Sequence, residues 1–192
     1  TGGQTLNPST AELLAAVEAV NSDQVVVLPN NKNIIPVAEQ LNALTQKHVV
    51  VAPTRSMPEA LAALVLYDPE ADAEANVAEM CDAVQSVAAG EITMAVRDTS
   101  SAAGQISTGD WIGIVRGDGI VAVSGSVVTA AQTLLARLVT PGREIVTIIT
   151  GSQAAAADTD LLVHWLAEER SSVQVEVHHG AQPLYPYLFG VE

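Results

Sequence analysis

The stretch of sequence that decides the fold reads QVVVLPNNKN, from Gln24 to Asn33. It begins as an apolar, β-branched run of the kind found in buried parallel strands. It ends in three asparagines and a lysine, directly before an amphipathic segment over residues 34–44. A strand that ends in polar side chains and then leads into a helix is a common ligand site in α/β proteins. The stretch therefore predicts a layered α/β fold and a candidate binding site.

Helix and strand signals alternate on both sides of this stretch. Ser9 and Glu12 have the spacing of a capping box, and apolar residues at helical spacing follow them, so a helix is expected after Ser9. Residues 48–52 repeat the β-branched pattern, which predicts a second strand of the same sheet. The rest of the first half predicts helices over residues 59–66 and 73–88, a stop at Gly90 and a strand over residues 91–97.

The second half of the chain has the same mixed pattern. Small and polar residues over 100–109 mark the predicted boundary between a first α/β lobe, residues 1–99, and a second, residues 100–192. An Asp-Gly turn between the apolar runs 111–115 and 120–123 predicts a β-hairpin. Further helices are expected over residues 127–139 and 158–169, and further strands over residues 144–150 and 173–177. The predicted fold class is α/β, mainly parallel in the first lobe and mixed, with a hairpin, in the second.

Composition and charge exclude several classes of function. The 192 residues are 48% hydrophobic and only 16% charged, which favours a well-buried globular core. The net charge of −14 opposes binding to nucleic acid or to an anionic membrane surface. No apolar run approaches the ~20 residues of a membrane span. Cys81 is the only cysteine, which excludes an intramolecular disulfide and a multi-cysteine zinc site, so a cytoplasmic protein is expected.

The polar residues after the two predicted strands form the candidate site. Asn30, Asn31, Lys32 and Asn33, the asparagine box, could bind an anionic ligand through their amides, the ammonium group and free helix N–H groups. Alternatively, they cap the helix and tie the strand edge to a neighbouring loop. Thr54 and Arg55 follow the second strand and could add a counter-charge to the same pocket, or form a surface salt bridge.

Signals for catalysis are weak in this chain. It contains no Gly-x-Ser-x-Gly nucleophile turn and no glycine-rich nucleotide loop. His178 and His179 are adjacent at the end of a predicted strand, where neighbouring side chains point to opposite faces and rarely bind one metal. An independent hydrolase or transferase would rest only on scattered hydroxyl groups, His178 and Asp98. We therefore predict no catalytic residue and no metal ligand.

Five motifs run through nearly the whole chain: GGQTLNPST at residues 2–10, LPNNKN at 28–33, APTRSMP at 52–58, AVRDT at 95–99 and VEVHHGAQPLYPY at 175–187. Together they resemble the C-terminal region of dihydroxyacetone-kinase-like proteins, the ATP-binding subunit of bacterial fatty-acid kinase. The resemblance implies that the kinase domain, with its ATP and Mg, lies upstream, so that this chain is a fragment that does not phosphorylate a substrate alone. It also implies a two-lobed, DegV-like (EDD-type) fold with a ligand crevice between the lobes.

The resemblance implies a set of ligand residues as well. Thr5 aligns with the carboxylate-binding threonine of DegV-type proteins, and His178 falls near the histidine of their Thr-His-x-Gly motif. Asn30 to Lys32 occupy the place of their serine-glycine loop. The chain departs from that pattern at this loop, and also at residues 124–126, where a neutral Ser-Gly-Ser replaces an expected arginine.

Two functions follow from these expectations. The first is a non-catalytic regulatory or docking domain of a fatty-acid kinase subunit, with the upstream kinase domain and a fatty-acid-binding protein as partners and a homodimer left open. The second is a binding module for a fatty acid or another small anion in the inter-lobe crevice, with the ligand set Thr5, Asn30, Asn31, Lys32, Thr54, Arg55 and His178. An apolar tunnel behind Thr5 and Asn31 would favour the second function, and a filled core would favour docking.

Overall fold

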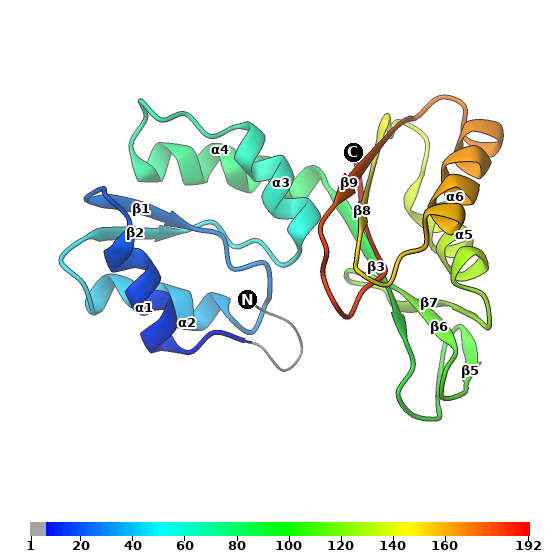
Figure 1. The fold of residues 1–192 in the computed structure, drawn as a ribbon. Coiled ribbons are helices and arrows are strands. Elements are labelled where there is room, and N and C mark those ends of the chain that lie inside the picture. The colour runs from blue at the N-terminus through cyan, green and yellow to red at the C-terminus, as the bar shows by residue number, and fades with distance from the viewer. Residues whose placement is uncertain (1–6) are drawn as a thin grey trace. The chain divides into compact units, whose positions relative to one another are not determined.

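A computed structural model describes residues 7–192 of the chain. The chain divides into two compact units, Thr1–Ser86 and Val87–Glu192, and in each of them helices pack on a sheet (Figure 1). This division lies before the predicted boundary between residues 99 and 100. The reason is that the strand Ala88–Met94, which the sequence suggested for the first lobe, pairs on both sides with strands of the second unit.

The first unit is built around two short parallel strands. Its elements are α1 (Thr10–Ala19), β1 (Gln24–Val27), α2 (Ile35–Glu39), the 3-10 helix η1 (Leu41–Ala43), β2 (His48–Val51), α3 (Met57–Val65) and α4 (Ala73–Ser86). Val25 lies opposite Val49 in the parallel register of β1 and β2, so the predicted strand pair is confirmed. The predicted capping box is also confirmed, because Ser9 and Glu12 each accept a hydrogen bond from the other's backbone N–H.

The predicted helix over residues 34–44 is shorter in the structure than the sequence indicated. The α-helical part ends at Glu39, and η1 follows as a separate 3-10 turn. In this turn Leu41 is fully buried and Asn42 accepts a hydrogen bond from the backbone N–H of Val49 in β2 (3.0 Å). Contact with the neighbouring strand therefore replaces a regular helical continuation.

Helices cover both faces of the β1–β2 pair, with α1 and α2 on one side and α3 and α4 on the other (Figure 1). One apolar cluster contains Val17, Val25, Ala38, Leu41 and Val49, and a second contains Ala52, Ala63, Met80 and Val84. Burial on both faces explains why these strands are continuous β-branched runs rather than alternating patterns.

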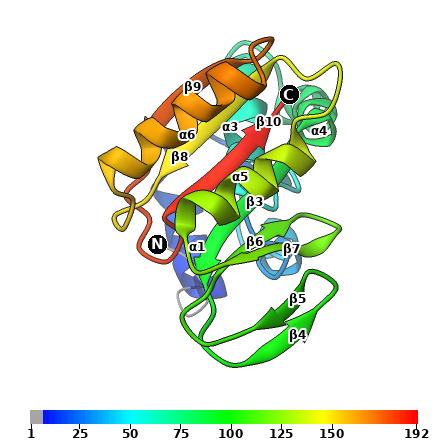
Figure 2. The same cartoon turned by 90° about the vertical axis from the view of Figure 1, so that its right-hand side faces the viewer.

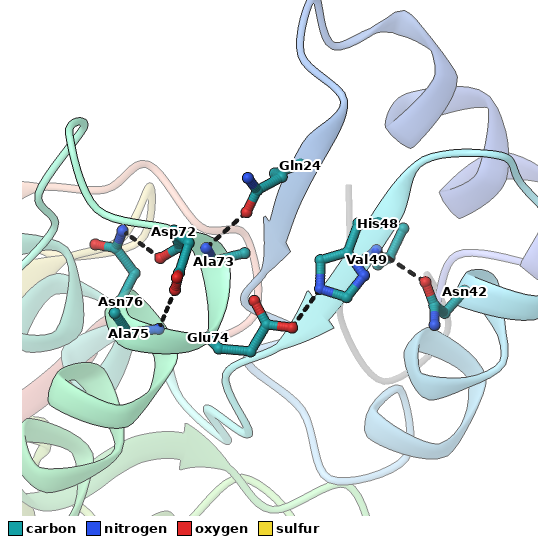
Figure 3. A network of polar contacts seen from close by, with 9 residues as sticks. All are labelled: Gln24, Asn42, His48, Val49, Asp72, Ala73, Glu74, Ala75 and Asn76. Carbon is teal, nitrogen blue, oxygen red and sulfur yellow. Dashed lines mark hydrogen bonds and ion pairs between the residues drawn. The ribbon is translucent and has the colours of Figure 1, made fainter.

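Polar contacts attach the start of α4 to the first residues of both strands (Figure 3). The Gln24 side chain accepts a hydrogen bond from the backbone N–H of Ala73 (2.9 Å). Nε2 of His48 lies 2.5 Å from a carboxylate oxygen of Glu74. These contacts hold the amino ends of β1 and β2, so the opposite, carboxyl-terminal ends remain for the asparagine box.

The second unit contains a six-stranded mixed sheet with the order β7-β6-β3-β10-β8-β9. Its elements are β3 (Ala88–Met94), β4 (Thr99–Ser101), β5 (Gly104–Ile106), β6 (Trp111–Val115), β7 (Gly119–Ser124), α5 (Val127–Leu138), β8 (Ile145–Thr150), α6 (Ala156–Glu169), β9 (Gln174–His179) and β10 (Tyr187–Val191). Only β8 and β9 are parallel neighbours, and β6 and β7 form the predicted hairpin. Helices α5 and α6 lie side by side over one face of the sheet (Figure 2). The predicted mixed α/β class is confirmed.

Gly90 does not end a helix, as the sequence suggested, but lies inside β3. Helix α4 already ends at Ser86. A Cβ atom at Gly90 would lie 2.9 Å from the Leu134 side chain and 3.0 Å from that of Leu138, both in α5. The glycine is therefore required for close packing of α5 on the sheet rather than for a helix end.

The last strand, β10, lies between β3 and β8 in the middle of the sheet. Tyr187 and Phe189 are fully buried there, and their rings stack with centroids 5.9 Å apart. The Tyr187 hydroxyl forms a 3.0 Å hydrogen bond with that of Thr159 in α6. Burial raises the pKa of Tyr187, so the phenol stays neutral and joins the sheet to α6.

Candidate functional site

The asparagine box begins where β1 ends. Asn30 has a φ of 56°, a left-handed conformation that asparagine adopts more readily than most residues. Its backbone N–H donates to the Thr54 hydroxyl (3.1 Å), and that hydroxyl donates to the Asn30 side-chain oxygen (2.8 Å). Thr54 is fully buried. The paired contact therefore ties the loop after β1 to the loop after β2.

Asn31 forms the turn that leads into α2. Its side-chain oxygen accepts from the backbone N–H of Asn33 (2.9 Å), which is an Asx turn, and its backbone oxygen accepts from that of Ile34 (3.0 Å). Its side-chain NH₂ donates to the side-chain oxygen of Asn7 (3.4 Å). Asn31 thus connects the turn to the segment that precedes α1. Lys32, the next residue, is exposed.

The loop that carries Arg55 is held by Glu59, a residue that sequence reasoning missed. Glu59 is fully buried in the first turn of α3, and its carboxylate accepts from the backbone N–H of Arg55 (2.7 Å). The Ser56 hydroxyl accepts from the backbone N–H of Glu59 (3.4 Å). The signal that could have found this arrangement is Ser-x-x-Glu, the same capping-box spacing that marks Ser9 and Glu12. Arg55 itself is exposed.

His178 lies in the second unit, near the end of β9. Its Nε2 atom is 3.6 Å from a carboxylate oxygen of Glu176, and both side chains are about half exposed. The adjacent His179 instead approaches the Thr150 hydroxyl through Nδ1 (3.1 Å). The two histidines therefore contact different neighbours, as expected for adjacent residues in a strand.

The predicted ligand residues fall into three groups. Asn30, Asn31 and Thr54 lie together at the carboxyl ends of β1 and β2, with Lys32 and Arg55 in the same two loops. His178 belongs to the other unit. Thr5 lies outside the described residues. The site that the structure describes is therefore one small polar cluster within the first unit.

In the second unit, the loops after β8 and β9 pack tightly against each other. The Ser152 backbone N–H donates to the oxygen of Gln182 (3.0 Å), and the Gln153 side chain donates to that of Pro183 (2.8 Å). A Cβ atom at Gly151 would lie 2.2 Å from the Tyr185 backbone oxygen. The segment 182–185 thus occupies the space beside the 151–153 loop.

Two carboxyl groups of the second unit have shifted pKa values. Burial raises the pKa of Glu91, which lies on β3. Hydrogen bonds from the Thr108 backbone (2.7 Å) and hydroxyl (2.8 Å) lower the pKa of Asp98. Asp98 therefore anchors the end of the β4–β5 hairpin, a structural task that accounts for its position.

Other kinds of site have little support in the described part of the chain. Within residues 7–192, no group of three or more His, Cys, Asp or Glu side chains is arranged to hold a metal ion. No helix of this described part is long and apolar enough to cross a membrane. Two surface hollows are lined by Gly142, Arg143, Glu144, Ile145, Ser172 and Gln174, and by Glu18, Val20, Asn21, Ser22, Asp23 and Lys47. Neither hollow includes the asparagine box.

Comparison of the sequence with known proteins gives matches along the whole chain. The model of the FakA-like C-terminal family, which describes the C-terminal part of fatty acid kinase subunits, matches residues 1–192. Protein YloV of Bacillus subtilis (strain 168) is 40% identical over 191 residues, which is 100% of this chain and 34% of YloV. An uncharacterized protein of Staphylococcus aureus (strain USA300) is 39% identical over 191 residues, which is 100% of this chain and 35% of that protein. The chain spans about a third of the length of these curated relatives.

Comparison with solved structures identifies the fold. A DegV family protein from Corynebacterium glutamicum matches 100% of this chain and 84% of its own, with a TM-score of 0.65 and 14% identity. One from Eubacterium eligens, loaded with heptadecanoic acid, matches 96% and 77%, with a TM-score of 0.65 and 11% identity. The dihydroxyacetone kinase of C. freundii matches 96% and 41%, with a TM-score of 0.61 and 15% identity. The predicted DegV-like fold is confirmed.

Proposed function

The chain belongs to the FakA-like C-terminal family of fatty acid kinase subunits, and from this premise we propose that it is a non-catalytic docking domain. In this proposal it receives a fatty-acid-binding protein and supports phosphorylation of the bound fatty acid by a kinase domain of the same longer protein. The family that the sequence motifs predicted is thereby confirmed, and the regulatory and docking role is the part proposed here.

One observation carries the proposal, namely the bonded pair of Asn30 and Thr54. Both groups were candidates for holding a ligand, yet each already has its partner in the other. A ligand that used them would have to break these bonds, at about 1 kcal/mol for each. The pair therefore supports a structural role for the asparagine box, in which it fixes the two loops of a docking domain.

The remaining parts of the proposal follow from charge and length. The net charge of −14 opposes nucleic acid as a partner. ATP and Mg are assigned to the additional length of the longer relatives rather than to this domain. A cytoplasmic location is part of the same proposal, because phosphorylation of this kind uses ATP.

A second candidate function is the binding of a fatty acid by this chain itself. A DegV family protein that shares the fold is loaded with heptadecanoic acid. In this chain, Lys32 and Arg55 supply two exposed cations near the carboxyl ends of β1 and β2. A carboxylate could be held there by charge without disturbing the Asn30–Thr54 pair.

A pair of binding measurements separates the two functions. Calorimetric titration with an oleate-loaded DegV family protein of the same organism should show a complex with this chain. Oleate alone should leave the melting temperature of the chain unchanged. A ligand at 100 times its Kd stabilises the native state by about 2.7 kcal/mol, so a clear rise in melting temperature with oleate, without a protein complex, would establish the second function instead.

A further inference from the structure

Helix α3 has its large apolar side chains on the outside. Ala60 and Ala63 are buried, whereas Leu61, Leu64 and Val65 are exposed, with 82% of Val65 accessible. An ordinary surface helix has the opposite arrangement, because it buries its largest apolar residues. The spacing of residues 61, 64 and 65 places these three side chains together along one stripe of the helix.

The apolar surface continues past the end of the helix. Leu66 and Tyr67 follow directly and are also exposed, at about half of their area. Single exposed apolar residues are common on protein surfaces, but a contiguous group of this kind marks an interaction site. We call Leu61, Leu64, Val65, Leu66 and Tyr67 the α3 surface.

Acidic residues border the α3 surface. Asp68, Glu70 and Asp72 follow it and are all exposed. The sequence has no lysine or arginine between Arg55 and Arg97, so no basic side chain of this segment balances them. The carboxylates of Asp68 and Asp72 accept hydrogen bonds from nearby backbone N–H groups, which leaves their negative charge in place.

The charge of this border selects the occupant. A second copy of the chain would bring the same acidic border and a further net charge of −14, and an anionic membrane surface would be repelled as well. We propose that the α3 surface binds a protein whose contact face has apolar side chains ringed by lysine and arginine. This inference rests on the proposed docking function, in which that protein is the fatty-acid-binding partner.

Substitution at Val65 tests the proposal with a matched control. Val65→Lys places a cation in the α3 surface, while Val96→Lys makes the same change at a valine that is 89% exposed in the second unit. Calorimetric titration of each variant with the oleate-loaded DegV family protein of the same organism should show a Kd raised roughly tenfold or more for Val65→Lys. The Val96→Lys variant should bind like the unmodified chain.

Two further variants separate apolar contact from charge. Leu64→Ala removes apolar area without adding charge and should raise the Kd at every ionic strength. Glu70→Lys should raise the Kd most at low ionic strength, where the acidic border acts over the longest distance. Circular dichroism spectra that match the unmodified chain show that each variant folds, which is expected because all of these side chains are exposed.

The outcomes distinguish this inference from the docking function on which it rests. If the unmodified chain does not bind the DegV family protein, the docking function fails. If it binds, and the three α3 variants keep the affinity of Val96→Lys, docking stands and the α3 surface is wrong. If Val65→Lys instead abolishes self-association seen by sedimentation velocity, the occupant is a second copy. If it lowers only the melting temperature of a longer family member, the occupant is linked chain. Either result overturns the inference.

Discussion

At the scale of single residues, the molecule uses its polar side chains chiefly to fix loops. Thr54 is the clearest case, because its buried hydroxyl serves two groups of Asn30 at once. Glu59 is similar, since its buried carboxylate binds the backbone beside it rather than facing solvent. Buried polar groups are costly unless they are bonded, so such contacts determine where the two loops lie.

Thr54→Val should therefore destabilise the chain. The substitution keeps the shape of the side chain but leaves the N–H and side-chain oxygen of Asn30 without this partner, at a cost of about 1–3 kcal/mol. Urea denaturation should show this loss, and Thr54→Ser, which keeps the hydroxyl, should recover most of it. Thr140→Val is a control at an exposed threonine. Equal stability of Thr54→Val and Thr140→Val would show that the paired contact contributes nothing.

Glu91 gives a prediction about pH. Burial raises its pKa above the usual value of 4.5, so the folded protein binds this proton more tightly than the unfolded chain does. The ionised carboxylate therefore destabilises the fold at neutral pH, and this cost disappears as the pH falls through the raised pKa towards 4.5. Glu91→Gln should raise the free energy of unfolding at pH 7 and weaken its dependence on pH in that window.

The matched control for Glu91 is Glu79→Gln, at an exposed position of α4. Denaturation curves collected from pH 4.5 to pH 7 would provide the comparison. The expectation about Glu91 is wrong if both variants change the free energy of unfolding equally across this range.

At the scale of helices and strands, local patterns predicted what local contacts determine. The capping box at Ser9, the parallel strands β1 and β2 and the β6–β7 hairpin all depend on neighbouring residues, and all were predicted. The assignment of β3 to the first lobe depended on sequence order alone. Its true neighbours come from far along the chain, and no local pattern records such a pairing. The Asn30–Thr54 contact was foreseen only as an alternative, because a ligand site and a loop tie require the same residues.

Gly90→Val should disturb the packing of α5 on β3. Even a single added carbon at Gly90 would crowd Leu134 and Leu138, and two further methyl groups would force these buried side chains or the helix to move. Overpacking of this kind costs about 1–3 kcal/mol. Gly125→Val is the control, because nothing lies within 4 Å of a Cβ atom at Gly125. A thermal melt in which the two variants unfold together would refute the packing role.

At the scale of the whole molecule, the second unit depends on its last strand. β10 pairs with β3 on one side and with β8 on the other, so its removal would divide the sheet into two parts. The sequence predicted that Tyr187 and Phe189 pack a C-terminal strand, but the central place of that strand follows only from the pairing. Fold class was thus predictable from composition and pattern, whereas strand order was not.

A chain that ends at Pro186 should therefore lose the ordered second unit. It would lack Tyr187, Phe189 and the ladder of backbone hydrogen bonds to both neighbours. Hydrogen exchange should show loss of protection in β3 and β8, while β1 and β2, which have their own clusters, should keep theirs. Protected β3 and β8 in the shortened chain would contradict this expectation.

The central position of β10 also sets an order of events during protein synthesis. β1 and β2 are separated by a short stretch of chain and can pair soon after both have left the ribosome. The sheet of the second unit cannot close until residues 187–191 have emerged, so β3 must wait while almost a hundred residues are translated. During that interval its apolar edges are open to wrong pairing, which makes this stage the one at which a chaperone would have the greatest effect on yield.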